Sequence, residues 1–595
     1  MNEARPSHSL LLHLLLRTAS SSIADIVLSL FWFEMAPVWS TVLGPLLFAA
    51  VQPALSSPTC KGEPRRGAVA SELDICSKIG TDLLKAGGNA VDAAVGTTFC
   101  VGTAGMYHSG LGGGGFLVVR SEAGEYEFID FRETAPAAAY EDMYVDDPDQ
   151  SIYGGLASGV PGEPRGLEYV HKKYGALAWK DVLAPSIKLA RFGWKVNEDL
   201  IYYMNAVGGT FLTDDPTWAI DFAPHGKRLE LGETITRKRY ANTLETLAEE
   251  GADALYTGAI ANATIAHLQK LNGTMTLEDL QNYTIAHRPT AEINYRGFKL
   301  TSATAPSGGI VVLSALNGAA GYESFDDPEQ VNLTTHRLDQ TTRFAYGQRS
   351  SLGDPVFVDG LTEFQERMIS AEVAAEVRSK ISDTQAFNIS YYDPSGLESL
   401  ETPGTSHIVS ADSSGLAVSM TTTINLLFGS QVMIPETGVI MNNEMNDFSI
   451  PGVTNAFGYI PSPANFIRPG KRPLSSMSPT IIETADGKLY MSIGAAGGSR
   501  IITSTIQNIH NVLDKGLNIH DALAFPRWHD QLSPERITFE WAYDNSTVAF
   551  LKGLGHNVTY VRPGQSSAQG LRLLTNGTFE ASGEPRQTNS GGYAV

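Results

Sequence analysis

The stretch Glu401-Thr-Pro-Gly-Thr-Ser-His407 marks the point at which the character of the chain changes. Residues 337–395 upstream of it are helix-like, and a polar stretch follows them. Two runs rich in β-forming residues, 407–411 and 415–422, come directly downstream and are separated by the turn sequence Asp412-Ser-Ser414. The sequence therefore predicts a β-hairpin that begins within this stretch.

The rest of the chain contains both helix-like and strand-like segments. Apolar residues at helical spacing identify the helices, and short β-rich runs identify the strands. Helices are expected at residues 71–86, 90–101, 501–513 and 546–551 and over most of 160–285, and strands at 116–120, 126–131, 438–441, 480–483 and 488–493. Strands interspersed with helices in this way indicate sheets packed on each other with helices outside.

Length and charge limit the possible functions. A chain of 595 residues, 43% of them hydrophobic, is long enough to bury a large core. Its formal net charge of −21 argues against binding to phosphate backbones or anionic membrane surfaces, because both require clustered Lys and Arg side chains. We therefore expect no nucleic acid partner.

Residues 1–57 differ in composition from the remainder. Three apolar runs, 10–16, 23–33 and 36–54, are interrupted by Arg17, Glu34 and Pro37, and none is a clean span of about 20 apolar residues. The part from Met35 has the features of a signal peptide, and a membrane-anchor segment is the alternative. Both predict the secretory pathway, with an extracellular, vacuolar or cell-surface destination.

Acceptor sites for N-linked glycans agree with that route. The chain has 25 asparagines, of which about three or four would begin an Asn-x-Ser/Thr acceptor by chance. Eight of them do so, namely Asn262, Asn272, Asn282, Asn332, Asn388, Asn545, Asn557 and Asn576. The excess predicts a glycoprotein.

The chain has only three cysteines, Cys60, Cys76 and Cys100. In an oxidising compartment, Cys76 and Cys100 are candidates for a disulfide that joins the two adjacent predicted helices. The alternative is a pair of buried thiols. Three cysteines this far apart do not form a metal site, so no metal is expected.

The Gly404-Thr405 pair must be read together with other segments, because a Thr that follows Gly at the head of a strand is not informative by itself. These segments are Asp82-Leu-Leu-Lys-Ala-Gly-Gly-Asn-Ala-Val-Asp92, Phe131-Arg-Glu-Thr-Ala-Pro136, Thr421-Thr-Thr-Ile-Asn-Leu-Leu-Phe-Gly429, Met441-Asn-Asn-Glu-Met-Asn-Asp-Phe448, Pro473-Leu-Ser-Ser-Met477 and Gly494-Ala-Ala-Gly-Gly498. In order and approximate spacing, they resemble the signature segments of γ-glutamyltransferases. The resemblance runs from about Gly67 to the C-terminus.

The resemblance implies a fold and a processing event. The fold is the α+β class, a four-layer αββα sandwich of the N-terminal nucleophile hydrolase type. The precursor is expected to cut itself between Gly404 and Thr405. The products are a large subunit, residues 58–404, and a small catalytic subunit, residues 405–595, which form a heterodimer from one precursor.

Elementary chemistry explains why such a cut would activate Thr405. An internal Thr hydroxyl has no base beside it, whereas an N-terminal Thr carries an α-amine with a pKa of about 7.7–8.0 that can accept the hydroxyl proton. The resemblance assigns Thr423 to orient that amine. Gly404 suits the strained turn that the cut requires, since it has no Cβ. His407 is expected to be structural, because the amine already supplies a base.

The resemblance also implies roles in substrate binding. Arg132 is expected to clamp the α-carboxylate of a γ-glutamyl donor, with hydroxyl donors from Ser475 and Ser476. The α-ammonium is assigned to Asn425, Glu444 and Asp447. The backbone N–H groups of Gly497 and Gly498 would form the oxyanion hole.

Each of these assignments has a plainer alternative. Arg132 would then form a surface ion pair, and Glu444 and Asp447 would lie in a solvated acidic turn. The two serines would be ordinary loop hydrogen bonders, and the Gly497-Gly498 pair would be a tight turn.

The function implied is hydrolysis of glutathione and transfer of its γ-glutamyl group to water, amino acids or dipeptides. Two alternatives remain, a related acylase acting on glutaryl or cephalosporin-type amides, and an uncleaved, inactive binding homologue. No cofactor is expected. The run from Gly112 to Gly115 lacks the Gly-Lys-Ser/Thr of a phosphate loop and is interpreted as a tight turn near the substrate pocket.

Overall fold

The computed structural model describes residues 65–397, 404–452 and 460–595. The predicted hairpin is present, with β9 (Ser406–Asp412) and β10 (Ala417–Thr423) paired in antiparallel fashion. Every residue of both strands is buried, which means that both faces of the hairpin are covered by other parts of the protein.

The hairpin lies at the centre of a seven-stranded sheet. The strand order is β18 (Gly591–Ala594), β1 (Gly67–Ser71), β9, β10, β2 (Gly114–Arg120), β3 (Tyr126–Asp130) and β6 (Ala286–Arg288). All neighbouring strands in this sheet are antiparallel.

A second sheet of six antiparallel strands packs against the first. Its order is β17 (Phe579–Ser582), β16 (Ser567–Leu573), β12 (Leu489–Ala496), β11 (Thr480–Glu483), β8 (Phe298–Ala303) and β7 (Thr290–Tyr295). β12 lies against both β9 and β10. At this contact a Cβ on Gly494 would overlap the ring of His407, so glycine is what allows the two sheets to approach each other there.

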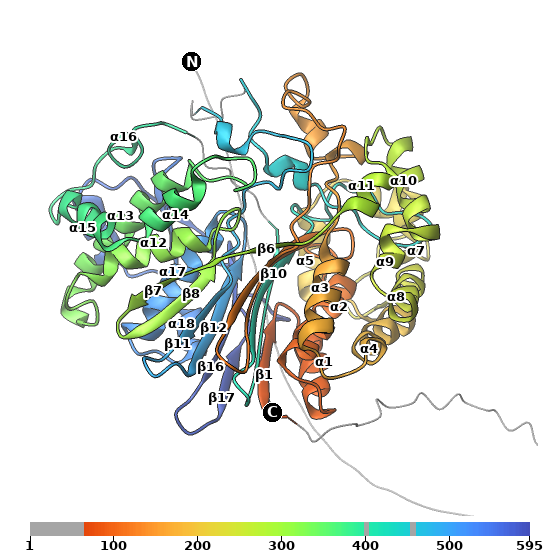
Figure 1. Cartoon of the computed structure of the whole chain (residues 1–595), viewed down its shortest axis with the longest axis horizontal. Coiled ribbons are helices and arrows are strands. Elements are labelled where there is room, and N and C mark those ends of the chain that lie inside the picture. Colours follow the sequence, from red (N-terminus) through yellow and green to blue (C-terminus); the bar gives the residue numbers. More distant parts are fainter. Residues whose placement is uncertain (1–64, 398–403, 453–459) are drawn as a thin grey trace, which may run out of the picture. The chain divides into compact units, whose positions relative to one another are not determined.

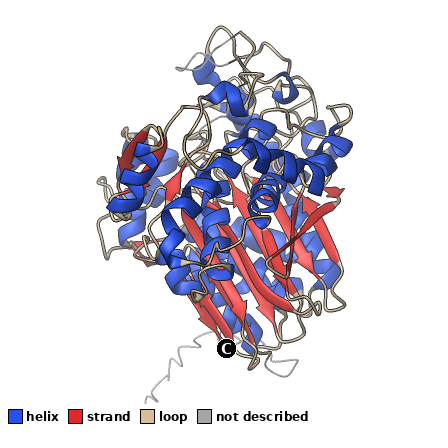
Figure 2. Ribbon diagram, turned by 90° about the vertical axis from the view of Figure 1, so that its left-hand side faces the viewer, coloured by secondary structure: helices blue, strands red, loops and turns tan. Residues whose placement is uncertain are grey.

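Helices cover the outer faces of both sheets (Figures 1 and 2). The first sheet is covered by α1 (Asp74–Lys85) and α2 (Ala90–Ala104), with α3 (Glu163–Tyr174), α4 (Trp179–Phe192) and α8 (Lys238–Glu250) beyond them. The second is covered by α12 (Gly309–Ala320), α17 (Arg500–Leu513) and α18 (Ile519–Ala524), with α13 (Val331–Arg349) packed on α12. The order helix, sheet, sheet, helix confirms the predicted αββα sandwich.

The remaining elements surround these layers. The other helices are α5 (Glu198–Ala206), α6 (Phe211–Asp214), α7 (Pro216–Phe222), α9 (Asp253–Tyr256), α10 (Gly258–Lys270), α11 (Leu277–Asn282), α14 (Leu361–Met368), α15 (Ala371–Lys380), α16 (Ile389–Tyr392) and α19 (Asn545–Gly553). The other strands are β4 (Trp194–Lys195), β5 (Thr234–Ile235), β13 (Trp528–His529), β14 (Ile537–Glu540) and β15 (Val558–Val561).

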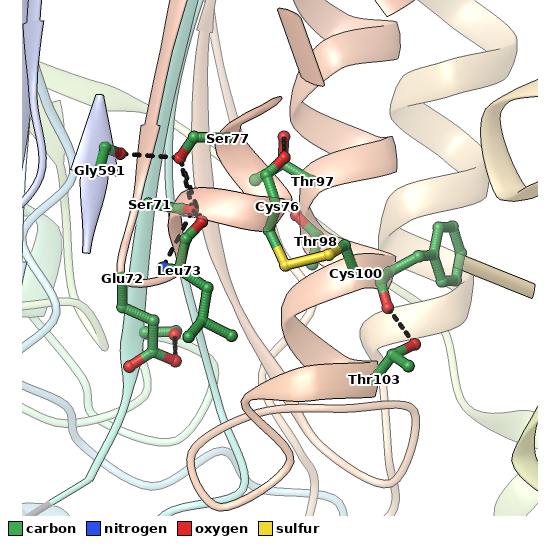
Figure 3. Close-up of a disulfide and its surroundings, with 12 residues drawn as sticks. Ser71, Glu72, Leu73, Cys76, Ser77, Thr97, Thr98, Cys100, Thr103 and Gly591 are labelled. Atoms are coloured by element: carbon green, nitrogen blue, oxygen red, sulfur yellow. Dashed lines mark hydrogen bonds between the residues drawn. A yellow bond between two sulfur atoms is a disulfide. The ribbon is translucent and has the colours of Figure 1, made fainter. Parts of the chain in front are cut away.

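A disulfide joins α1 to α2, which confirms the candidate pair and not the alternative of two buried thiols. Cys76 and Cys100 are bonded to each other, and both are fully buried where the two helices pack together (Figure 3). The bond closes a loop between residues separated by 24 positions. Cys60 and the predicted signal or anchor segment 1–57 lie outside the described residues.

One predicted strand is wrong. Residues 438–441 belong to neither sheet and make only isolated bridges, Met441 with Gly112 and Ile440 with Met433. Gly438 has a φ of +68°, which belongs to a turn, so the segment begins on a bend and cannot extend a regular ladder.

Seven of the eight glycan acceptor asparagines are exposed. The eighth, Asn332, is half-buried and accepts a hydrogen bond of 2.6 Å from the Thr547 hydroxyl.

Within the described part of the chain, no helix has both the length and the apolar character that a membrane span requires.

Candidate active site

The register of the hairpin places Thr405 and Thr423 side by side. Ser406 pairs with Thr422, so the next positions along the two strands are Thr405 and Thr423. The Thr405 hydroxyl donates a hydrogen bond of 3.3 Å to Thr423 Oγ1. Thr423 Oγ1 also accepts the backbone N–H of Asn425 at 2.8 Å, which fixes its position.

The backbone is unusual on both sides of the Gly404–Thr405 bond. Gly404 has a φ of +132°, and an added Cβ would overlap the carbonyl oxygen of Asn425 and lie 2.9 Å from its carbonyl carbon. Thr405 has a φ of +95°, which β-branched residues adopt only under strain. Such conformations cost about 1–3 kcal/mol each and are retained where the surrounding structure enforces them.

The turn after β12 lies against the same bond. Gly497 and Gly498 have φ values of +119° and +60°. The Gly497 N–H donates a hydrogen bond of 3.1 Å to the carbonyl oxygen of Gly404. One of the two predicted oxyanion donors is therefore aimed at the carbonyl that precedes Thr405.

A small polar pocket of about 30 Å³ opens beside Thr405. It brings together most of the residues that the sequence singled out, namely Arg132, Thr405, Thr423, Asn425, Glu444, Asp447, Ser475, Ser476 and Gly498. Gly404 and Gly497 border an adjoining cleft that Thr405 also lines. Segments from both sides of residue 404 thus meet around one threonine.

Arg132 is fully buried at one end of this pocket and holds two of the predicted acids. Nη1 donates to Glu444 and Nη2 donates to Asp447, both on a short 3₁₀ turn (Glu444–Asp447). A third carboxylate, that of Glu133, lies 3.9 Å from Nη1. Arg132 is thus an internal ion-pair residue of the pocket, and the surface ion pair considered from the sequence does not occur.

Three buried carboxyl groups surround one guanidinium, so they cannot all be ionised with a positive partner of their own. Burial raises the pKa of Glu444 well above its ordinary range, and the charge of Arg132 opposes this shift. Burial likewise raises the pKa of Glu133 to about 8. Burial acts to lower the pKa of Arg132, but the charges of the surrounding acids outweigh it and the net shift is upward. The pocket therefore favours an additional cation.

The remaining predicted residues are also held by neighbours. Ser476 Oγ accepts a hydrogen bond of 3.0 Å from Arg349, and Ser475 Oγ accepts the N–H of Met477 at 3.2 Å. Asn425, in a left-handed conformation, donates to the carbonyl of Asn443 at 3.0 Å. Sequence reasoning missed Arg349, because it ends a helix and belongs to no recognised motif.

The adjoining cleft is larger, with a volume of about 510 Å³. His108, Arg500 and Arg562 border it together with Thr405. None of these three was singled out from the sequence. His108 is four positions before Gly112, and Arg500 is two positions after Gly498, so proximity to a motif was the available signal.

His407 lies between the two sheets and borders neither cavity. Its Nδ1 is 2.8 Å from Thr421 Oγ1, and burial lowers its pKa to about 3, which keeps the ring neutral.

The glycine run 112–115 permits close approach of backbone segments, because a Cβ on Gly113 would overlap the Thr423 carbonyl. Among the described residues, no cluster of His, Cys, Asp and Glu side chains is arranged to hold a metal ion.

Comparison with known proteins adds independent evidence. A family model described as gamma-glutamyltranspeptidase matches residues 76–594. A glutathione hydrolase proenzyme from Arthroderma benhamiae is 55% identical over 553 residues, covering 91% of this chain and 94% of the relative. A glutathione hydrolase from Aspergillus flavus is 49% identical over 90% of each chain.

Solved structures share the fold. A cephalosporin acylase from Bacillus halodurans superposes with a TM-score of 0.78 at 26% identity, covering 89% of this chain and 96% of the acylase. A gamma-glutamyltranspeptidase chain from Helicobacter pylori gives a TM-score of 0.51 at 30% identity, covering 53% of this chain and 92% of its own. The match across residues 76–594 and the identities of 55% and 49% over nine-tenths of the length show that this chain belongs to the γ-glutamyltranspeptidase family.

Proposed function

We propose that this protein hydrolyses glutathione and transfers its γ-glutamyl group to amino acids, dipeptides or water, after cutting itself between Gly404 and Thr405. One observation carries the proposal. A buried guanidinium and an excess of buried carboxylates lie in the same small pocket as Thr405. A γ-glutamyl group presents a carboxylate and an ammonium on one carbon, and this pocket has a partner for each.

Self-cleavage is supported by the geometry of the uncut bond. The Gly497 N–H polarises the Gly404 carbonyl, and the positive φ of Thr405 stores strain that is relieved on cutting. In the proposed step, Thr405 Oγ attacks the Gly404 carbonyl carbon, the C–N bond breaks and the nitrogen gains a proton. Water then hydrolyses the resulting ester. Residue 405 emerges with a free amine, and the large chain ends in the Gly404 carboxylate.

The same parts then serve turnover. The freed amine of Thr405, oriented by Thr423, accepts the proton of Oγ as that oxygen attacks the γ-amide carbon. The N–H groups of Gly497 and Gly498 stabilise the oxyanion that forms. The leaving amine departs with a proton, and a γ-glutamyl ester remains on Thr405. Water or an acceptor amine attacks the ester and regenerates the hydroxyl.

Substrate binding exchanges partners within the charged pocket. In the free site, Glu444 and Asp447 hold Arg132. The substrate ammonium takes the place of the guanidinium beside the acids, with Asn425 as a further partner. The substrate carboxylate accepts from Arg132, and Ser475 and Ser476 line the same pocket.

The acylase alternative meets an electrostatic objection. A glutaryl amide has the carboxylate but lacks the ammonium, so it would bind Arg132 and leave Glu444 and Asp447 uncompensated in a buried site. Leaving a buried charge unpaired typically costs several kcal/mol, about 3–5. The similarity to a cephalosporin acylase concerns the fold.

The test compares two anilides that differ only in the α-amine. γ-Glutamyl-p-nitroanilide should be cleaved with kcat/KM at least about 100-fold above glutaryl-p-nitroanilide, as expected from an unpaired buried charge. Equal rates, or a preference for the glutaryl compound, would favour the acylase. A protein that stays one chain on a denaturing gel and cleaves neither would be the inactive binding homologue.

We also propose passage through the secretory pathway. The Cys76–Cys100 disulfide and the seven exposed acceptor asparagines support it. Enzymatic removal of N-glycans from protein expressed in its own type of cell should increase its mobility on a gel, and unchanged mobility would contradict the proposal.

A further inference from the structure

The cleft beside Thr405 contains polar groups that the proposed mechanism does not use. Its volume of about 510 Å³ falls within the range of about 300–1,000 Å³ typical of small-molecule sites. Gly404, Thr405 and Gly497 border it, so a molecule bound there would lie against the reacting bond. The small charged pocket shares Thr405 with the cleft, but His108, Arg500 and Arg562 do not line that pocket.

His108 and Glu72 form a buried pair at this cleft. His108 Nδ1 lies 2.7 Å from Glu72 Oε2, and the two residues are 6% and 2% exposed. The other carboxylate oxygen of Glu72 accepts the hydroxyl of Ser406, the residue after Thr405. The pair is thus connected to the nucleophile's own strand.

The imidazole is fixed in position and keeps one nitrogen free. The rings of Tyr107 and Tyr203 pack edge-on against it, with centroids 4.7 and 4.4 Å away. The acids that line the cleft are Glu198 and Asp199, and the charges of Glu72 and Asp199 act on Tyr203. A carboxylate on Nδ1 favours the tautomer in which Nε2 is an acceptor. Within residues 65–397, 404–452 and 460–595, Nε2 has no hydrogen-bond partner.

Two arginines add positive charge to the same cleft. Arg562 is exposed and donates to the Tyr202 hydroxyl, with its guanidinium 5.1 Å from that ring's centroid. Arg500 makes no side-chain hydrogen bond or ion pair with any residue in the described part of the chain. A third arginine at the cleft, Arg586, is already paired with two glutamates.

We propose that this cleft binds the peptide that leaves or accepts the γ-glutamyl group, and that His108 Nε2 accepts a proton from the ammonium of that peptide while Arg500 and Arg562 bind its carboxylate. The inference rests on the proposed function and goes beyond it by assigning the acceptor its own residues. The class of ligand is a short peptide or amino acid with a free amine and a free C-terminal carboxylate.

The proton transfer makes the acceptor a nucleophile. The ammonium N–H bond breaks, its proton goes to Nε2, and the neutral amine attacks the ester carbonyl on Thr405. A new amide C–N bond forms and the C–Oγ bond breaks. The second amine proton goes to Thr405 Oγ, and the proton on His108 passes to solvent, so the sum is ester plus ammonium giving amide, hydroxyl and one proton.

The first experiment measures transfer and hydrolysis separately. With γ-glutamyl-p-nitroanilide and glycylglycine at pH 6.5, only about 3–6% of an acceptor amine with a pKa of about 7.7–8.0 is neutral. His108→Gln must rely on that fraction, so it should lower the ratio of transfer to hydrolysis at least about 10-fold. Exposed His225→Gln is the matched control and should leave the ratio unchanged. At pH 9.5 the acceptor amine, with a pKa of about 7.7–8.0, is already neutral, so the His108→Gln deficit should shrink.

A second variant keeps the proposal testable if His108→Gln is not processed to two chains. Arg562→Gln should raise the KM for glycylglycine about 3-fold or more, as for a partly exposed ion pair, and leave the KM for glycylglycine amide unchanged. Exposed Arg367→Gln serves as its control.

The outcomes distinguish this inference from the proposed function. If the wild type neither hydrolyses nor transfers, the proposed function fails. If the wild type does both and His108→Gln keeps the wild-type ratio, or if Arg562→Gln raises both acceptor KM values equally, the assignment of the cleft is wrong and the proposed function stands.

Discussion

Replacing Gly404 with Ala should strongly slow self-cleavage. The residue has a φ of +132°, and its Cβ would overlap the Asn425 carbonyl oxygen. The φ strain costs about 1–3 kcal/mol and, together with the overlap, forces the backbone at residue 404 to shift. Relief of the overlap would further shift the Gly404 carbonyl away from the Gly497 N–H that polarises it.

The assay follows loss of the single-chain precursor on denaturing gels after a pulse of synthesis. We expect Gly404→Ala to mature at least about 100-fold more slowly than the wild type, as the combined strain and displacement imply. Gly516→Ala is the matched control, because Gly516 also has a positive φ, +68°, but nothing lies within 4 Å of its added Cβ. Maturation of Gly404→Ala at the wild-type rate would refute the reasoning.

Three further substitutions test other parts of the account. Arg132→Lys replaces a guanidinium fork with a point charge, so binding of γ-glutamyl anilide should weaken about 10- to 200-fold. Binding of γ-aminobutyryl anilide, which has no carboxylate, should weaken little more, and equal losses for both anilides in a kinetic comparison would make Arg132 structural. Burial raises the pKa of Glu163 to about 7, against about 4.3 in the unfolded chain, so the wild type loses stability as pH rises from about 4.3 to 7. Glu163→Gln should therefore gain about 3.7 kcal/mol relative to the wild type over that window, and a pH-independent difference in thermal unfolding would contradict this. The Cys76→Ser/Cys100→Ser double variant should lose about 3.5 kcal/mol by the chain-entropy model for a loop closed across 24 positions, visible as a lower Tm than that of a Cys60→Ser control.

Much of the fold could be predicted because local patterns and long-range packing agree. The hairpin of β9 and β10 was recognisable from its β-rich runs and the turn between them, and β11 has the expected limits, Thr480–Glu483. Residues 438–441 are β-rich too, but a turn at Gly438 leaves them with isolated bridges. The residue types in this segment do not show that its glycine adopts the positive φ of a turn.

The candidate site was less accessible from the sequence. Motif matching located the residues that surround Thr405, yet it gave no indication that Arg132 would hold Glu444 and Asp447 in the free pocket. The pairing arises because the end of β3 and the 3₁₀ turn meet only in the folded chain. The His108–Glu72 pair was missed for the same reason, since 36 positions separate the two residues.

The N-terminal sequence of the smaller chain tests the central claim most directly. Protein purified without protease treatment should separate on a denaturing gel into two chains, and Edman degradation of the smaller should read Thr-Ser-His-Ile-Val, residues 405–409. Thr405→Ala should remain a single chain without activity. A wild-type protein that turns over γ-glutamyl anilide efficiently while still uncut at Gly404–Thr405 would contradict the account.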